Sequence, residues 1–327
     1  MNEPVLTIVV PCFNEEEVLE ETNKRLRAVL QHAVHDHLAA HGSTILYVDD
    51  GSKDRTWDLI SRFIRDYADV TGVKLSRNFG HQNALIAGIE SSRPYSDCVV
   101  TIDADLQDDV NTITKFLEKY QEGYDIVYGV RDKRDTDTFF KRNTALLFYR
   151  IMDKLGVKMV PNHADFRLLD RRVLNEFVKY QEENVFLRGM IPLLGFRSTK
   201  VYYNRAERYA GKSKYPLKKM LNFAIDGITS FSIAPIRMVT YLGMGVAGIG
   251  FLAALYAVIQ KILGHTVTGW SSVILSIWLI GGLQLIATGV IGEYIGKIFK
   301  ETKHRPRYTI EKQTLADQHT AFTRRAL

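Results

Sequence analysis

The chain has 327 residues, enough for one large domain with an appendage or for two domains, and its formal net charge is +6. Its two cysteines, Cys12 and Cys98, are far apart in the sequence and lie in or beside predicted buried strands, which indicates reduced core thiols. The basic charge balance does not indicate a nucleic-acid partner, because no segment interleaves basic and aromatic residues, and anionic lipid head groups explain it more simply.

The first part of the chain alternates predicted strands with predicted helices. The expected strands are Leu6–Pro11, Thr44–Asp49, Gly72–Ser76, Cys98–Asp103 and Ile126–Gly129. The expected helices are Glu16–His35, Thr56–Tyr67, Gln82–Glu90 and Val110–Tyr120. This alternation predicts an α/β fold, a mostly parallel sheet with helices on both faces. The sequence before the first strand has no basic n-region and no small-residue cleavage site, so we expect no signal peptide and a first part that stays in the cytosol.

Polar side chains gather where the predicted strands end. Asp103 and Asp105 stand one residue apart at the end of the fourth strand. Ligands bind at the carboxyl ends of strands in open α/β sheets. Two hard oxygen ligands there suit Mg²⁺ or Mn²⁺ holding a substrate diphosphate. The pair alone is a weak signal, but Glu15, Asp49–Asp50 and Arg77 follow other strands, so we expect all of them around one crevice.

Two long apolar stretches follow, Met238–Ile259 and Trp270–Gly292, without Asp, Glu, Lys or Arg. Each can span a bilayer of about 30 Å as a helix. Buried core helices are the alternative, but a soluble fold rarely carries two such runs in tandem. Basic residues flank the outer ends of this hairpin, which predicts that both chain termini lie in the cytoplasm. Small residues in the stretches are compatible with a homo-oligomer.

These patterns divide the chain into four expected regions. A catalytic domain covers residues 1–215 and a membrane-interface amphipathic helix region covers 216–234. A two-helix transmembrane hairpin covers 235–300 and a cytoplasmic tail covers 301–327. From Thr309 onward we expect the tail to be weakly ordered or packed between subunits.

Six motifs in order carry a resemblance to a known family. They are P-C-F-N-E-E-E, V-D-D-G-S-K-D, L-S-R-N-F-G-H-Q, D-A-D-L-Q-D, H-A-D-F-R-L-L-D and R-Y-A-G-K-S-K-Y. The chain resembles the inverting family 2 glycosyltransferases with a Rossmann-like GT-A fold. Within them it is most similar to the polyprenyl-phosphate glycosyltransferases, the group containing dolichol-phosphate mannose synthase and the bacterial bactoprenol glucosyl transferases. The resemblance runs from Leu6 to about Tyr308.

The resemblance implies a site for a nucleotide sugar. Its residues would be Pro11, Asn14, Glu15, Asp49, Asp50, Asp103, Gln107 and Arg131. The cluster that holds the metal and the diphosphate would consist of Asp103, Asp105 and Gln107. Asp105 would be a more direct metal ligand than Asp103. Alternatives remain, since Asp49 is also suited to cap the following turn and Arg131 to be a plain surface arginine. We interpret Ser52 and Asp54 as caps of the helix that opens near Arg55.

The resemblance also implies catalytic residues and a site for a lipid phosphate. Asp165 matches the position of a catalytic base, with Asp105 and Arg208 as further catalytic groups. A phosphate monoester is mostly dianionic at neutral pH and is already a nucleophile, so Asp165 is equally suited to position substrate. The lipid-phosphate residues would be Arg167, Arg208, Lys212, Ser213 and Lys214. An ion pair for Arg167 and a solvated basic face for the others are the alternatives.

The expected activity is inverting transfer of a sugar to polyprenyl (undecaprenyl) phosphate at the cytoplasmic membrane face. The resemblance favours UDP-glucose as donor, with GDP-mannose as an alternative, and Mg²⁺ or Mn²⁺ as cofactor. Another lipid acceptor, a non-catalytic scaffold and a flippase-like protein are the competing hypotheses. The expected partners are a nucleotide sugar, a polyprenyl phosphate and the membrane, without nucleic acid.

Overall fold

The computed structural model describes residues 3–132, 163–183, 186–204, 234–264 and 269–314. The chain divides into two compact units. The first unit comprises residues 1–150, 158–216 and 305–327, and the second comprises residues 151–157 and 217–304. The predicted interfacial helix within 216–234 lies outside the described residues, and the four expected region boundaries stay a prediction.

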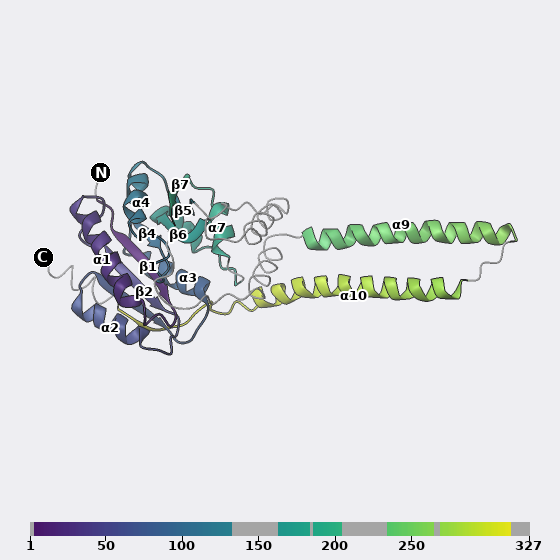
Figure 1. The fold of residues 1–327 in the computed structure, drawn as a ribbon, viewed down its shortest axis with the longest axis horizontal. Helices are drawn as coiled ribbons and strands as arrows, with labels where there is room; N and C mark the ends of the chain where they lie inside the picture. The colour runs from purple at the N-terminus through teal and green to yellow at the C-terminus, as the bar shows by residue number, and fades with distance from the viewer. Residues whose placement is uncertain (1–2, 133–162, 184–185, 205–233, 265–268, 315–327) are drawn as a thin grey trace. The chain divides into compact units, whose positions relative to one another are not determined.

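An eight-stranded mixed sheet forms the centre of the first unit, in the order β7-β5-β6-β4-β1-β2-β3-β8 (Figure 1). The strands are β1 (Leu6–Cys12), β2 (Thr44–Asp49), β3 (Val70–Leu75), β4 (Cys98–Thr101), β5 (Ile126–Arg131), β6 (His163–Asp170), β7 (Ser198–Tyr203) and β8 (Ile310–Gln313). Strand β1 runs parallel to β2 and β4, and β3 runs parallel to β2. Strand β6 is antiparallel to β4 and β5, and β8 is antiparallel to β3. The carboxyl ends of β1 to β4 therefore meet at one edge of the sheet.

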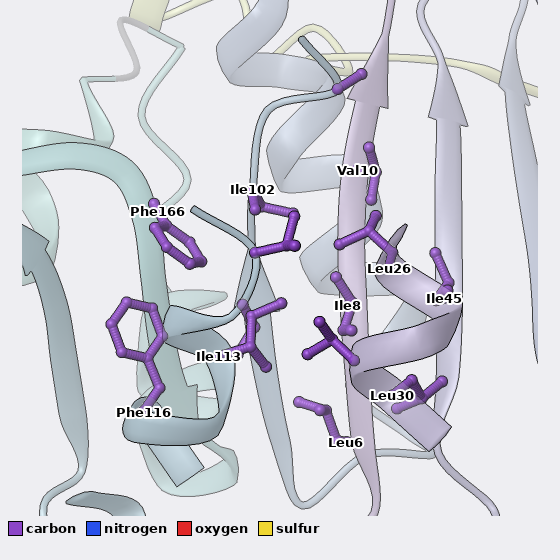
Figure 2. Close-up of a cluster of buried hydrophobic side chains, with 14 of the residues drawn as sticks. Leu6, Ile8, Val10, Leu26, Leu30, Ile45, Ile102, Ile113, Phe116 and Phe166 are labelled. Carbon is purple, nitrogen blue, oxygen red and sulfur yellow. The ribbon is translucent and has the colours of Figure 1, made fainter. Parts of the chain in front are cut away.

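Helices cover both faces of this sheet. They are α1 (Leu19–His35), α2 (Thr56–Asp66), α3 (His81–Ser92), α4 (Thr112–Gln121), α6 (Arg171–Phe177) and α7 (Leu187–Leu193). Every residue of β1 is buried, as expected for a central strand covered on both sides. Leu6, Ile8 and Val10 of β1 lie in one core cluster with side chains of α1 and α4 (Figure 2). Helix α3 packs on the opposite face, where Gly88 lies against Val9.

The five strands and four helices expected in the first part are present, with ends that move by up to three residues. The short helices α6 and α7 and the strands β6, β7 and β8 were not expected. Strand β6 has the sequence HADFRLLD, in which charged residues on buried positions hide the strand pattern. The expectation for the tail is wrong over Ile310–Gln313, because these residues pair with the edge strand β3.

A salt bridge and hydrogen bonds hold the chain just before β8. Arg307 donates hydrogen bonds to Glu90 of α3 at 2.7 Å and to the carbonyl of Tyr180 at 3.1 Å. The hydroxyl of Tyr308 also donates to Glu90. We call Glu90, Arg307 and Tyr308 the Glu90 clamp. Charge-assisted hydrogen bonds are stronger than neutral ones, so the clamp accounts for the order of a segment whose sequence is polar.

The second unit contains two long helices, α9 (Ala234–Ile262) and α10 (Trp270–Glu301). Each includes one of the two expected apolar stretches, and the helices contact each other (Figure 1). Their apolar side chains are exposed, with Ile249 70% and Leu285 75% accessible. Such a surface is unfavourable in water. Both helices are long and apolar enough to cross a membrane.

The close approach of α3 to the sheet gives a first prediction. A Cβ at Gly88 would overlap the side chains of Val9 and Val48, whereas a Cβ at Gly42 would meet no atom within 4 Å. We expect Gly88→Ala to lower the free energy of unfolding by about 1–3 kcal/mol and Gly42→Ala to leave it unchanged within error. Urea unfolding of both variants in detergent measures this. Equal stabilities would contradict the close packing of α3.

The Glu90 clamp gives a second prediction. Glu90→Gln should speed hydrogen exchange of the β8 amides by roughly tenfold or more, because a charge-assisted contact is lost. The matched control is Glu311→Gln in β8 itself. Its carboxylate pairs with Lys74 at 3.2 Å across an exposed surface, and such pairs contribute little. If both variants exchange alike, the clamp does not hold the strand.

Candidate active site

A turn of fixed shape carries Asp103 and Asp105 beyond the end of β4. Leu106 follows with φ of 56°, a left-handed conformation that is unfavourable for leucine. Its side chain is buried in the core cluster, which compensates this strain. The Gln107 N–H donates to Asp105 Oδ1 at 3.2 Å. The two carboxylates therefore stand on a hydrogen-bonded turn at the carboxyl ends of the strands, where ligands bind in open α/β sheets.

Asp103 has features of a metal ligand. Its side chain is one-third exposed, yet its Oδ1 atom is buried and has no hydrogen-bond partner among the described residues. The closest cationic atom given is His81 Nε2, at 3.5 Å. Burial raises the pKa of Asp103 to about 6, although His81 opposes the shift.

The donor set fits a divalent cation that is shared with a substrate. Within the described parts of the chain no three His, Cys, Asp or Glu side chains are placed to hold a metal. Mg²⁺ is commonly bound by one or two carboxylates together with substrate phosphates. Asp103 and Asp105 supply two carboxylates, and the orphaned oxygen of Asp103 is suited to this role.

Asp165 lies in β6 beside the strand that leads to Asp103. It is 4% exposed and accepts hydrogen bonds from Arg167, from Arg188 at 3.1 Å and from Gln82 at 3.4 Å. Burial alone would raise the pKa of Asp165, but Arg188, His81 and Arg167 outweigh it and hold the pKa well below its usual range. A carboxylate with so low a proton affinity is a poor general base.

His81 connects the two acidic groups. Its Nε2 lies 3.5 Å from Asp103 and 3.6 Å from Asp165. Burial would lower the pKa of His81, but these two carboxylates raise it to about 9. The structure therefore brings Asp103 and Asp165 together around His81, and the two carboxylates favour its protonated form.

Arg167 is fully buried and forms an ion pair with Asp165. Its side chain is 1% exposed, and its Nε and Nη1 atoms have no hydrogen-bond partner among the described residues. This geometry matches the ion-pair alternative for Arg167. A lipid phosphate does not reach such a group without movement of the residues that cover it.

The expected nucleotide-binding residues near β1 and β2 largely shape a loop. Asn14 has φ of 53°, accepts a hydrogen bond from the Lys53 N–H and donates its own N–H to Ser52. Asp49 Oδ1 accepts the Ser52 N–H at 3.1 Å, so this oxygen caps the following turn, as the alternative interpretation of Asp49 expected. Asp49 Oδ2 is buried and unpaired among the described residues, so this oxygen is suited to a ligand.

Asp50 holds a second loop. It accepts the N–H groups of Phe79 at 2.7 Å and Gly80 at 2.9 Å, just before α3. Both carboxylate oxygens thus bind backbone, which indicates a structural role. Gly51, at φ of 67°, lies against the backbone of Arg77, where any Cβ would overlap it. The Gly51 contact and Asp50 together fix the chain that leads to His81.

Other expected site residues have clear partners. Pro11 is buried in β1 opposite Val48, and the Glu15 N–H donates to Thr56. Asp54 caps the start of α2 by accepting the Thr56 N–H. The expectation that Ser52 is also a helix cap is wrong, because its hydroxyl accepts the Asn14 N–H.

Arg131 is held by an acidic partner at the end of β5. It forms a salt bridge with the buried Asp108 at 3.1 Å, and the hydroxyl of Tyr203 donates to the same carboxylate at 2.5 Å. Arg131 is one-quarter exposed, so it is not a plain surface arginine. Arg208, Lys212, Ser213 and Lys214 lie outside the described residues.

Sequence reasoning missed His81, Gln82 and Arg188. His81 and Gln82 follow a strand end and belong to the motif L-S-R-N-F-G-H-Q. A search for polar residues after each predicted strand, which identified the other polar clusters, therefore had the signal needed to include them. Arg188 lies on the short helix α7, away from any strand end. No pattern in the sequence marks it.

Comparisons with known proteins identify the family of the chain. The family model described as Glycosyl transferase family 2 matches residues 7–178. The chain is 56% identical over 323 residues to the "Uncharacterized glycosyltransferase YkoT" of Bacillus subtilis, covering 99% of this chain and 96% of that protein. It is 40% identical over 310 residues to the "Bactoprenol glucosyl transferase" of Shigella phage SfX, covering 94% of this chain and 99% of that protein.

The chain therefore belongs to glycosyl transferase family 2. It is a glycosyltransferase with an α/β domain of the GT-A type, followed by two helices of membrane-spanning length. The predicted family and fold class are confirmed.

The Gly51 contact gives a third prediction. Gly51→Ala should displace the loop before α3 and weaken nucleotide binding, measured with UDP and Mn²⁺ as probe ligands, on the order of tenfold or more. The matched control is Gly195→Ala, because Gly195 has a similar φ of 72° but no atom within 4 Å of its Cβ position. Calorimetry on both variants separates the overlap from the backbone strain. Equal UDP affinities would show that the loop does not shape the nucleotide site.

Proposed function

We propose that the protein transfers a sugar, with inversion, from a nucleotide sugar to polyprenyl phosphate at the cytoplasmic face of a membrane. One combination supports this proposal above all. A sheet edge carrying Asp103, Asp105 and Asp165 occurs in the same chain as two exposed, apolar helices. The relatives named bactoprenol glucosyl transferase match nearly the full length, which favours glucose as the sugar. UDP as its carrier rests on the resemblance described above. GDP-mannose is the alternative donor.

The proposed reaction is a single displacement. An oxygen of the lipid phosphate attacks the anomeric carbon, and the bond from that carbon to the nucleoside diphosphate breaks. The products are a polyprenyl monophosphate sugar of inverted configuration and a free nucleoside diphosphate. Asp103, Asp105 and Gln107 would hold Mg²⁺ or Mn²⁺, which when bound neutralises charge on the leaving diphosphate.

The surroundings of Asp165 favour a phosphate over an alcohol as acceptor. A lipid alcohol must lose a proton during attack, which requires a base. The cations around Asp165 hold its pKa well below its usual range, so it is ill suited to that task. A phosphate monoester with a second pKa near ~6 needs no base at neutral pH. In this proposal Asp165 is therefore not a base, and it positions the side chains that bind it, Arg167, Arg188 and Gln82.

The remaining residues keep the roles that the resemblance implies, as part of the proposal. Asp49, with its unpaired buried oxygen, and Asn14 would contact the nucleoside. Arg208, Lys212, Ser213 and Lys214 would bind phosphates at the membrane surface. The helices α9 and α10 would anchor the catalytic domain, with both chain termini in the cytosol.

A fourth prediction tests the reaction. Purified protein in detergent is incubated with undecaprenyl phosphate, Mg²⁺ and radiolabelled UDP- and GDP-sugars, and label in the organic phase is counted. We expect transfer from one donor and a loss on the order of 100-fold in Asp105→Asn, because a metal ligand is removed. Asp109→Asn is the control, since Asp109 is exposed and bonds only within its own turn in the contacts given. Transfer to a lipid alcohol instead would refute the proposed acceptor.

A further inference from the structure

A buried acidic residue anchors the turn that carries Asp103 and Asp105. Asp108 lies just after this turn, and its side chain is 1% exposed. Its Oδ1 atom accepts hydrogen bonds from Arg131 Nη2 at 3.1 Å, from Arg131 Nε at 3.3 Å and from the hydroxyl of Tyr203 at 2.5 Å. A buried carboxylate is stable only when it is paired, so these contacts tie the turn to the residues that supply them.

The two partners of Asp108 stand side by side at strand ends. Arg131 and Tyr203 are paired residues of the parallel strands β5 and β7. The Asp132 N–H donates to the Tyr203 carbonyl at 2.9 Å. The Tyr203 ring lies edge-on to the ring of Phe166, with centroids 5.5 Å apart. This packing fixes the direction of the hydroxyl that binds Asp108.

Exposure separates Arg131 from the two residues that hold it. The Arg131 side chain is 24% exposed, whereas that of Asp108 is 1% exposed and Tyr203 is 5% exposed. Both bonds to Asp108 come from one edge of the guanidinium, which carries five N–H donors in a planar fork. Of these three residues, Arg131 is therefore the one that a ligand from solution can contact.

The place of this group in the sheet favours a substrate phosphate. Strand β6 is antiparallel to both β4 and β5, and β7 is parallel to β5. The strands β4, β5 and β7 therefore end at the same edge, where ligands bind in open α/β sheets. A guanidinium with a fixed direction suits a phosphoryl group, because its planar fork matches the oxygens.

We propose that Asp108 and Tyr203 are a positioning pair that holds the Arg131 guanidinium against a phosphoryl group of a substrate. This inference rests on the proposed function and adds to it two residues that do not touch the substrate. Asp108 directs the guanidinium, and the Tyr203 hydroxyl directs Asp108. Because Asp108 also follows the turn with Asp103 and Asp105, the pair keeps Arg131 in register with that turn.

The test uses Tyr203→Phe, which keeps the packed ring and removes the hydroxyl alone. Dissociation constants are measured with the full-length protein in detergent for two pairs of ligands that differ by their phosphates. One pair is UDP or GDP with Mn²⁺, whichever the wild type binds more tightly, and its nucleoside. The other pair is farnesyl phosphate and farnesol.

We expect one phosphate ligand to bind Tyr203→Phe roughly 3- to 10-fold more weakly, the range of one lost hydrogen bond. The ligands without phosphate should bind unchanged. Asp108→Asn should weaken the same ligand at least as much, because the guanidinium loses its charged partner. A weaker nucleoside diphosphate assigns Arg131 to the donor, and a weaker farnesyl phosphate assigns it to the acceptor. Both results support the positioning role.

The matched control is Tyr120→Phe, which removes the same kind of bond elsewhere. The Tyr120 hydroxyl donates to Asp170 at 3.0 Å, and Asp170 also accepts from Arg172 at 3.2 Å. This second group lies at the opposite edge of the sheet, because Asp170 pairs with Cys98 at the start of β4. Tyr120→Phe should leave the affinities of all four ligands unchanged.

A double-mutant cycle shows whether Tyr203 acts through Arg131. Arg131→Gln alone should weaken the affected phosphate ligand roughly 10- to 100-fold. In that background Tyr203→Phe should have no further effect, because the group that it positions is gone. An undiminished effect would assign Tyr203 to general stability and overturn the inference.

Two other results would also overturn it. One is an unchanged affinity of both phosphate ligands in Tyr203→Phe, and the other is equal weakening of the ligands with and without phosphate. Failure of the proposed function has a different signature. If the wild type transfers no sugar from any donor, that function fails, while the affinity ratios still decide the role of Asp108 and Tyr203.

Discussion

The buried carboxylate of Asp165 is the interaction on which the site depends. A buried charge needs partners, and removing one of them is strongly unfavourable. The partners of Asp165 come from different parts of the chain: Arg167 from β6, Gln82 from α3 and Arg188 from α7. The requirement to pair one charge therefore fixes three elements around the sheet edge. His81, placed between Asp165 and Asp103, extends the same electrostatic network to the turn that carries Asp103 and Asp105.

The start of α3 is held from two sides. Asp50 binds the backbone just before the helix, and the carboxylates of Asp103 and Asp165 lie beside its first residue, His81. Acidic groups favour a helix N-terminus because they complement its dipole. The loop after β2, the turn after β4 and the strand β6 thus all contact the N-terminal end of α3. A displacement of any of these segments changes the surroundings of the other two.

The sequence predicted the parts of this arrangement that follow simple rules. Asp103 and Asp105 were found because a β-branched, apolar run ends in them, and the parallel strands followed from their alternation with helices. The resemblance, and not a pattern, pointed to Asp165, since β6 places charged residues at buried positions. Arg188 stands on a seven-residue helix without a distinctive sequence. Its importance comes from a contact across the fold, which no local pattern encodes. Strand β8 was missed for the same reason, because its polar residues pair with β3 and the residues just before it bind Glu90.

The position of β8 has a consequence for the behaviour of the catalytic domain in isolation. An edge strand with unpaired N–H and C=O groups is a template for pairing with other chains. Here β8 covers β3, and its outward residues include Glu311 and Lys312, charges that discourage further strand addition. A fragment that ends before the first long helix lacks this cover and exposes β3. The residues that follow the second long helix thus protect the sheet from aggregation, and a soluble version of the domain has to include them.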